Sequence, residues 1–97
     1  MVKHVLFCKL KDYSVENANK LRDVFLSMKG NVPVIVDVKS EIDFLRSERS
    51  FDVMLEVTLN SREDLQVYAQ DKYHCEVVKT YVHSVIACTN VVVDYEY

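Results

Sequence analysis

The chain has 97 residues, 49% of them apolar and 28% charged, with a formal net charge of −3. This length predicts a single domain over residues 1–97, and the apolar fraction excludes a disordered chain. The small negative charge, with no basic cluster, argues against nucleic-acid binding, and no apolar run approaches the roughly 20 residues that cross a bilayer.

The three cysteines show no C-x-x-C spacing, which argues against a disulfide framework or a zinc site. We expect reduced, mostly buried thiols. The chain shows no signal-peptide pattern, so we expect a cytoplasmic protein.

The first half of the chain predicts a strand, a helix and a second strand. Residues 3–10 alternate as a strand, with apolar side chains on both faces. Residues 14–29 predict a helix that Ser14 caps and Gly30 ends. Its apolar stripe consists of Leu21, Val24, Phe25 and Met28. Residues 34–44 alternate again, with charge on one face.

The second half predicts a loop, a strand, two helical segments and a last strand. Residues 46–50 form a polar, solvated loop, and residues 51–59 form the third strand. Ser61 caps the next helix, whose buried face consists of Leu65, Tyr68 and Ala69. A second helical stripe follows, made of His74, Val77, Val78 and Tyr81. Residues 86–95 are rich in β-branched side chains and form the last strand.

The order β-α-β-β-α-β predicts an α+β, ferredoxin-like protomer, in which a four-stranded antiparallel sheet carries its helices on one face. Several strands are apolar on both faces, and an uncovered apolar sheet face is an interaction surface. We therefore expect a homodimer through the open sheet face, which closes a shared α+β barrel.

Three side chains are candidates for chemistry: His4, Tyr68 and His74. Tyr68 and His74 lie about 240° apart on an unbroken helix, so they converge only if the helix breaks near Asp71. Two imidazoles and a phenol around one cavity suit proton abstraction next to a carbonyl, without metal or cofactor. The alternative is that all three are ordinary core residues.

Two neighbouring residues are excluded as partners in that chemistry. Cys75 diverges from His74 by about 100°, which argues against a Cys-His pair. His83 is expected on the surface, in the tether before the last strand.

These residues resemble a known family. Residues 2–7 (VKHVLF), residues 51–59 with the NSREDL that follows them, and the run from Leu65 to His74 resemble the stress-responsive A/B barrel (Dabb) family. The resemblance covers nearly the whole chain. It implies a small homodimeric α+β barrel, and most members of the family have no assigned activity.

The resemblance also implies a site. A plant polyketide cyclase of this fold closes a ring without a cofactor, and His4, Tyr68 and His74 match its strand histidine, helix tyrosine and second-helix histidine. Two departures stand out. Asp71 and Lys72 replace the usual His-Pro pair, and Val53 replaces a third-strand histidine.

Some family structures hold magnesium on backbone carbonyls after the first helix, here residues 29–35. Any residue supplies a carbonyl, so the sequence does not test this site, which would lie near Val32 and Ile35. We expect no metal and no cofactor.

The sequence leaves three functions open. The first is a cofactor-free cyclase or isomerase-like enzyme acting on a small carbonyl, polyketide-like compound, with His74 as base, Tyr68 as hydrogen-bond donor and His4 as orienting or second acid/base group. The second is a non-catalytic module that binds a small apolar ligand or acts in stress response. The third is a structural dimer, and a cofactor-free monooxygenase ranks below these.

Overall fold

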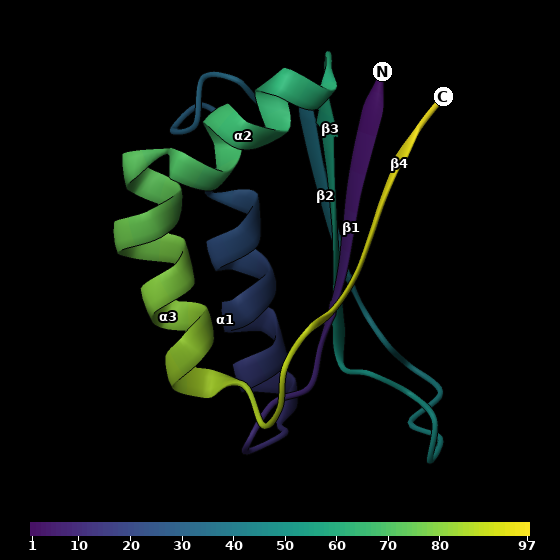
Figure 1. Ribbon diagram of the computed structural model, residues 1–97. Coiled ribbons are helices and arrows are strands. Elements are labelled where there is room, and N and C mark those ends of the chain that lie inside the picture. Colours follow the sequence, from purple (N-terminus) through teal and green to yellow (C-terminus); the bar gives the residue numbers. More distant parts are fainter.

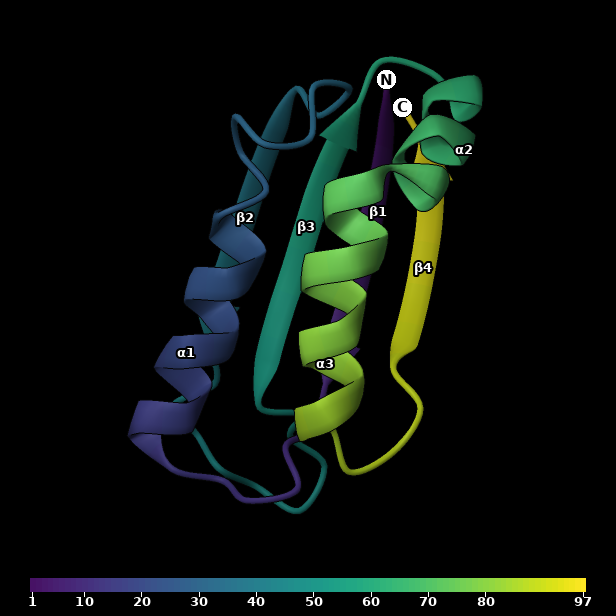
Figure 2. The ribbon, with the colours of Figure 1, turned by 90° about the vertical axis from the view of Figure 1, so that its left-hand side faces the viewer.

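The computed structural model describes residues 1–97 and has the predicted ferredoxin-like order (Figure 1). The sheet runs β2-β3-β1-β4, and all neighbouring strands are antiparallel. All helices lie on one face of the sheet (Figure 2), and the other face is uncovered (Figure 1). The elements are β1 (Val2–Cys8), α1 (Val15–Leu26), β2 (Asp37–Ile42), β3 (Val53–Leu59), α2 (Arg62–Gln70), the π-helix η1 (His74–Val78), α3 (Lys79–Val85) and β4 (Val91–Glu96).

Both predicted helix caps are confirmed. Ser14 Oγ accepts a hydrogen bond from Asn17 N at 3.0 Å, and Ser61 Oγ accepts one from Asp64 N at 3.2 Å. Each bond satisfies a backbone donor that the first turn leaves free. Gly30 has φ +87°, a left-handed conformation that only glycine adopts without strain. It therefore turns the chain shortly after α1 toward β2.

The core lies between the helices and the sheet. Leu21, Phe25 and Met28, from α1 and the turn after it, are fully buried against the inward side chains of β3. The stripe predicted for this helix is thus confirmed. Burial of side chains of this size stabilises the fold by about 1.5–3 kcal/mol each.

All four strands differ from the prediction at their ends, β1 (Val2–Cys8) and β3 (Val53–Leu59) by one or two residues and the other two by more. β2 covers Asp37–Ile42 rather than residues 34–44, and β4 begins at Val91 rather than at residue 86. Ile86 ends α3 and forms an isolated bridge with Leu10. The chain must then cross from this bridge to the outer edge of β1, so residues 87–90 form a connection instead of a strand.

The prediction of a second buried helical stripe is wrong at Val77, because this side chain is 45% exposed. The chain winds from His74 to Val78 as a π-helix, in which Lys79 N donates to His74 O. A π turn holds one more residue than an α turn and shifts the register of the side chains after it. The buried positions are Val78 and Val82.

The first predicted helical stripe of the second half also needs one correction. Tyr68 is buried and Leu65 is half-buried, but Ala69 is exposed.

Of the thiols, only Cys8 is buried, while Cys75 is half-buried and Cys88 is exposed, so the prediction of mostly buried thiols is wrong.

The open sheet face has two unlike halves. β2 contributes only charge to it, because Asp37, Lys39 and Glu41 pair with the outward residues of β3. The half over β1 and β4 is mostly apolar, since residues paired across strands share a face, and the ion pair of Lys3 with Glu56 lies at its border. Its apolar members are Val5, Phe7, Val91, Val93 and Tyr95, together with Met54 of β3.

Candidate functional site

Three rings from three elements meet on the helix-covered side of the sheet. The ring centroids of Tyr68 and His74 lie 4.2 Å apart in a stacked arrangement, and those of His4 and Tyr68 lie 5.5 Å apart. β1 contributes His4, α2 contributes Tyr68 and η1 contributes His74. The three residues singled out in the sequence are therefore neighbours in space, and their chemical roles remain predictions.

The helix break that this convergence requires lies at Asp71. α2 ends at Gln70, and Asp71 has an extended ψ of 136°. The carboxylate Oδ1 of Asp71 then accepts a hydrogen bond from His74 N at 3.0 Å, as an N-cap does. This turn brings His74 back over Tyr68.

His4 has a carboxylate partner that the sequence did not indicate. Its Nδ1 lies 2.5 Å from Oδ1 of Asp94, the residue directly opposite it on β4. A carboxylate accepts a hydrogen bond from Nδ1–H, and the neutral tautomer with its proton on Nδ1 keeps the lone pair on Nε2. Asp94 thus fixes the tautomer and the orientation of the His4 ring.

Tyr68 is a buried, neutral phenol. The residue is 3% exposed, and burial raises the pKa of its hydroxyl, with smaller contributions from Asp71 and Asp94. Its hydroxyl donates to Met28 Sδ at 3.7 Å, and a thioether is a weak acceptor. The phenol can exchange that bond for one to a ligand oxygen at little cost.

His74 is held in its neutral form. Burial lowers the pKa of its imidazole, and the positive charge of Lys79 adds to this, while the Ala69 carbonyl acts in the opposite direction. Its Nδ1 is buried and has no hydrogen-bond partner. Buried polar atoms without partners are uncommon in proteins, and one at a cavity wall is available to a ligand.

These rings line a cavity of about 150 Å³ between α3 and the sheet. A second, more open hollow of about 460 Å³ adjoins it and shares Leu6, His83 and Asn90 with it. Asn90 Oδ1 is the other buried polar atom without a partner. The two residues that carry these unpartnered atoms, His74 and Asn90, thus line the same cavity.

His83 lies on α3, not in the tether before β4. It is exposed as predicted, yet it is also part of the shared rim. Asp94 and Asn90 were missed because pairing across strands is non-local. The sequence indicates these two residues only weakly, because an acid and an amide in or next to a valine-rich strand are not distinctive.

Val53 does not line this cavity. It pairs with Cys8, whereas His4 pairs with Val57, four residues further along β3. At roughly 3.3 Å per residue, Val53 lies about 13 Å along the strand from that position. Its apolar character therefore leaves the polarity of this cavity unchanged.

The loop after α1 does not fit a magnesium ion. Lys29 Nζ donates to the carbonyl of Val36 at 2.5 Å and lies 3.4 Å from Asp37 Oδ1. The Val32 carbonyl accepts from Ile35 N at 3.1 Å. An ammonium group already supplies the positive charge here, and no group of three or more metal-ligating side chains occurs in the protein.

A model of the stress responsive A/B barrel domain matches residues 2–97. The chain belongs to this family. A search of curated proteins gave no match. None of the helices in this A/B barrel protein combines the length and apolarity needed to cross a membrane.

Solved structures with the same fold are numerous. A dimeric protein of unknown function from Bacteroides fragilis is 21% identical with a TM-score of 0.79, covering 99% of this chain and 95% of that one. A protein from Arabidopsis thaliana is 21% identical with a TM-score of 0.82, covering 100% and 95%. A hydroxynitrile lyase from Passiflora edulis is 17% identical with a TM-score of 0.77, covering 97% and 90%. At these identities the likeness shows the ferredoxin-like fold alone.

Proposed function

We propose that the protein is a cofactor-free proton-transfer enzyme of the cyclase or isomerase type, acting on a small carbonyl compound. The observation that carries this proposal is the cavity lined by His4, Tyr68 and His74, with ring centroids 5.5 and 4.2 Å apart. Acid/base catalysis needs such groups within direct or water-bridged reach of one substrate.

The three side chains divide the reaction between them. His74, neutral because its pKa is lowered, accepts the proton from the carbon next to the carbonyl. Tyr68 donates a hydrogen bond to the carbonyl oxygen as negative charge develops there. His4, oriented by Asp94, is the second acid/base group. The enolate then attacks a second carbonyl of the same molecule or takes the proton back at another atom.

The cavity wall also restricts the ligand. Asn90 Oδ1 has no donor, so a hydroxyl or enol group on the ligand would satisfy it. The rest of the lining is mostly aliphatic and aromatic, including Leu6, Phe25 and Leu55. A polyketide-like compound, apolar with a few oxygens, combines these properties.

A hydrogen–deuterium exchange assay tests the proposal directly. The protein is incubated in D2O with a panel of small diketones and aromatic polyketide-like compounds, and mass spectrometry follows deuterium uptake next to the carbonyl. We expect catalysed uptake that falls by about 10²–10⁴-fold in His74→Gln, the usual contribution of one acid/base group. Lys20→Gln, at an exposed position of α1 outside the cavity lining, is the control. A panel that gives no catalysed exchange with the wild type, although its members bind, contradicts the enzyme and supports the non-catalytic binding module.

We also propose that two copies pack through the open sheet face. The apolar half of that face includes Val91, Val93 and Tyr95, each 46–54% exposed. A patch of this kind is self-complementary about a two-fold axis, and similar folds are described as dimeric. Sedimentation equilibrium should give a dimer that Val93→Asp converts to monomer, while a monomeric wild type at micromolar concentration would overturn this proposal.

A cofactor-free monooxygenase is the second candidate function. An antibiotic biosynthesis monooxygenase has this fold at 10% identity and a TM-score of 0.76, covering 100% of this chain and 98% of that one. No side chain of the cavity favours it over proton transfer. Oxygen consumption with the compounds that bind would separate the two reactions.

A further inference from the structure

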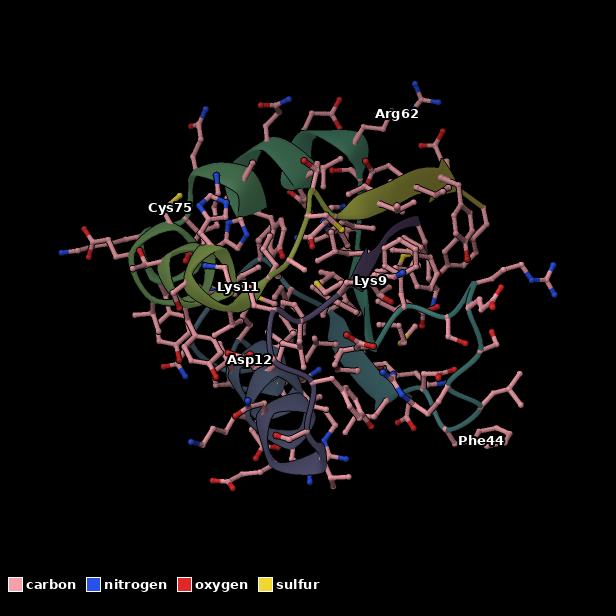
Figure 3. All side chains as sticks on the ribbon, turned by 90° about the horizontal axis from the view of Figure 1, so that it is seen from below. Lys9, Lys11, Asp12, Phe44, Arg62 and Cys75 are labelled. Carbon is pink, nitrogen blue, oxygen red and sulfur yellow. The ribbon has the colours of Figure 1, made fainter.

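The connection between β2 and β3 is a long loop, residues 43–52, that carries two exposed apolar side chains near its start. Hairpin connections usually have 2–5 residues, so ten is unusual. The loop leaves the sheet on the side away from the helices (Figure 1), and Phe44 lies at its outer edge (Figure 3). Phe44 is 92% exposed and Leu45 is 68% exposed. An isolated monomer gains nothing from presenting them to water.

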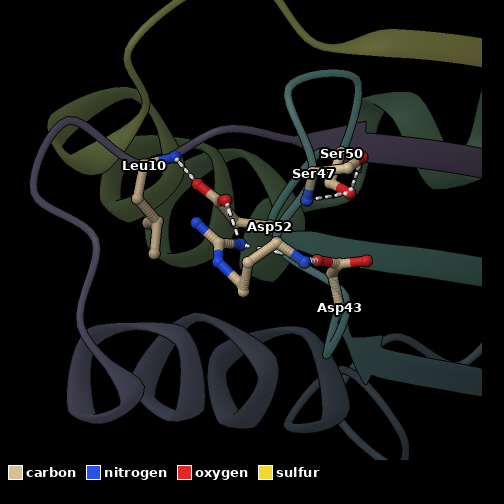
Figure 4. A network of polar contacts seen from close by, with 6 residues as sticks. Leu10, Asp43, Ser47, Ser50 and Asp52 are labelled. Carbon is tan, nitrogen blue, oxygen red and sulfur yellow. Dashed lines mark hydrogen bonds and ion pairs between the residues drawn. The ribbon is translucent and has the colours of Figure 1, made fainter.

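The base of this loop is firmly ordered (Figure 4). Asp52, 5% exposed, accepts from Leu10 N at 2.7 Å and from Arg46 Nη1 at 2.6 Å. Arg46 N donates to Asp43 Oδ2 at 2.7 Å, and the Arg46 guanidinium lies 3.5 Å from the ring centroid of Tyr13. Arg46 is exposed, as predicted for this loop, and it also has the partners described here, which the sequence did not indicate.

Ser47 and Ser50 close the turn of the same loop. Their hydroxyls lie 2.8 Å apart, and Ser47 N donates to Ser50 Oγ at 3.1 Å (Figure 4). A loop that is ordered before it meets a partner loses little conformational entropy on binding. Its rigidity therefore favours a docking role for Phe44 and Leu45.

The loop is continuous with the apolar half of the open face. A hollow of about 460 Å³ lies where the two meet, and its wall includes Phe7 and Met54 from the sheet and Phe51 from the loop. A partner that covers the open face also reaches the loop, because the loop extends to the same side of the sheet, away from the helices (Figure 1), and Phe51 shares a hollow with Phe7 and Met54.

We propose that residues 43–51 are a dimerisation arm whose Phe44 and Leu45 tip packs against a second copy of the chain. The inference rests on the homodimer proposed above and adds to it. The occupant is a second copy because the arm extends that interface without a break. A two-fold axis through the face presents both arms to the opposite sheet, so each protomer holds the other at two places.

The test compares a variant of the arm with a control variant at another exposed apolar position. Phe44→Ser/Leu45→Ser removes the tip, and Val15→Ser removes a side chain that is as exposed as Leu45, 68%, from the start of α1. Sedimentation equilibrium over a dilution series should show that the tip variant raises the dimer Kd by roughly 10- to 100-fold, as loss of two partly buried side chains implies. Val15→Ser should leave the Kd unchanged. Circular dichroism checks that each variant keeps the fold.

A second measurement uses the absence of tryptophan from the chain. The single indole of Phe44→Trp should emit at shorter wavelength in the dimer and shift to longer wavelength on dilution. An indole that stays solvent-exposed in a stable dimer overturns the arm. A shift that appears only with phosphatidylserine vesicles also overturns it, and points to a membrane surface instead.

The outcomes separate the two proposals. If the wild type is a dimer and the tip variant has the same dimer Kd, the proposal of the arm is overturned and the proposal of the homodimer stands. A wild type that is monomeric throughout the dilution series overturns the homodimer, and the arm with it. A tip variant that weakens a wild-type dimer while Val15→Ser does not supports both.

Discussion

His4 and Asp94 stand directly opposite each other on adjacent antiparallel strands, and their side chains meet at 2.5 Å between Nδ1 and Oδ1. Ninety residues separate them along the chain. The pair joins the strand next to the centre of the sheet to the edge strand, on the face that also carries the cavity. The His4 imidazole, held in this way, presents one defined nitrogen to a ligand that enters the cavity.

Loss of that carboxylate should change the tautomer of His4. We expect the wild type to carry its proton on Nδ1, and Asp94→Ala to move it to Nε2, because the Nδ1–H then has no acceptor. Long-range ¹H–¹⁵N correlation spectra at alkaline pH distinguish the two forms. Glu96→Ala, on the same strand, is the control. If both variants keep the wild-type spectrum, Asp94 does not orient the ring.

The stability of the protein should depend on pH through His74. Its pKa is lowered in the folded state, mainly by burial, so the unfolded chain binds the proton more readily. The contribution to stability is present above about pH 6.5 and is lost as the pH falls through the lower, folded-state pKa. The Tm of the wild type should therefore fall more between pH 7.5 and 5.5 than that of His74→Gln. His83→Gln should retain the wild-type fall; parallel profiles for all three proteins would contradict the assignment.

Truncation of Asp52 should destabilise the fold. Its buried carboxylate accepts from Leu10 N and from Arg46, so Asp52→Ala leaves a buried backbone donor without its partner and removes the shorter of the two ion pairs of Arg46. We expect a loss of about 2–4 kcal/mol in the free energy of unfolding, measured with urea. Asp23→Ala, at an exposed position of α1, should change it by less than about 0.5 kcal/mol. Equal effects of the two substitutions would show that the network adds nothing.

The three thiols should differ in reactivity. Burial, with smaller contributions from Cys88 and Asp52, raises the pKa of Cys8 to about 12, so its thiolate is scarce at pH 8. Cys88 is exposed and should react first with a disulfide reagent. Cys88→Ser should lose the fast phase, and Cys8 should react only after urea unfolds the chain. Rapid labelling of Cys8 in the folded protein would contradict its burial.

The order of elements was readable because it depends on local signals. Alternation along the strands, the apolar stripe of α1 and the serine caps at Ser14 and Ser61 act over a few residues each. The ends of β2 and β4 were not readable in the same way. Their limits depend on where a partner strand stops, and on the crossing that Ile86 makes after its bridge to Leu10.

The candidate site was readable in part for the same reason. Helix geometry alone required a break before Tyr68 and His74 could meet, and Asp71 is a residue that makes such breaks. Asp94 and Asn90 depend on strand register and on the path of residues 87–90, which no local pattern specifies. The exposed position of Val77 was missed because a π turn leaves no periodic signal in the sequence.

That π turn makes the site sensitive to chain length. Deleting one residue between Cys75 and Val77 would give a regular α-helix, and it would rotate His74 by about 100° relative to Val78 and Val82. The composition of the cavity would be unchanged, yet the imidazole would point away from Tyr68. Alignments that run through this segment without a gap would therefore match residues that occupy different sides of the helix. Comparisons of this cavity with those of its relatives should therefore match residues by their place on the helix, and not by their position in the sequence alone.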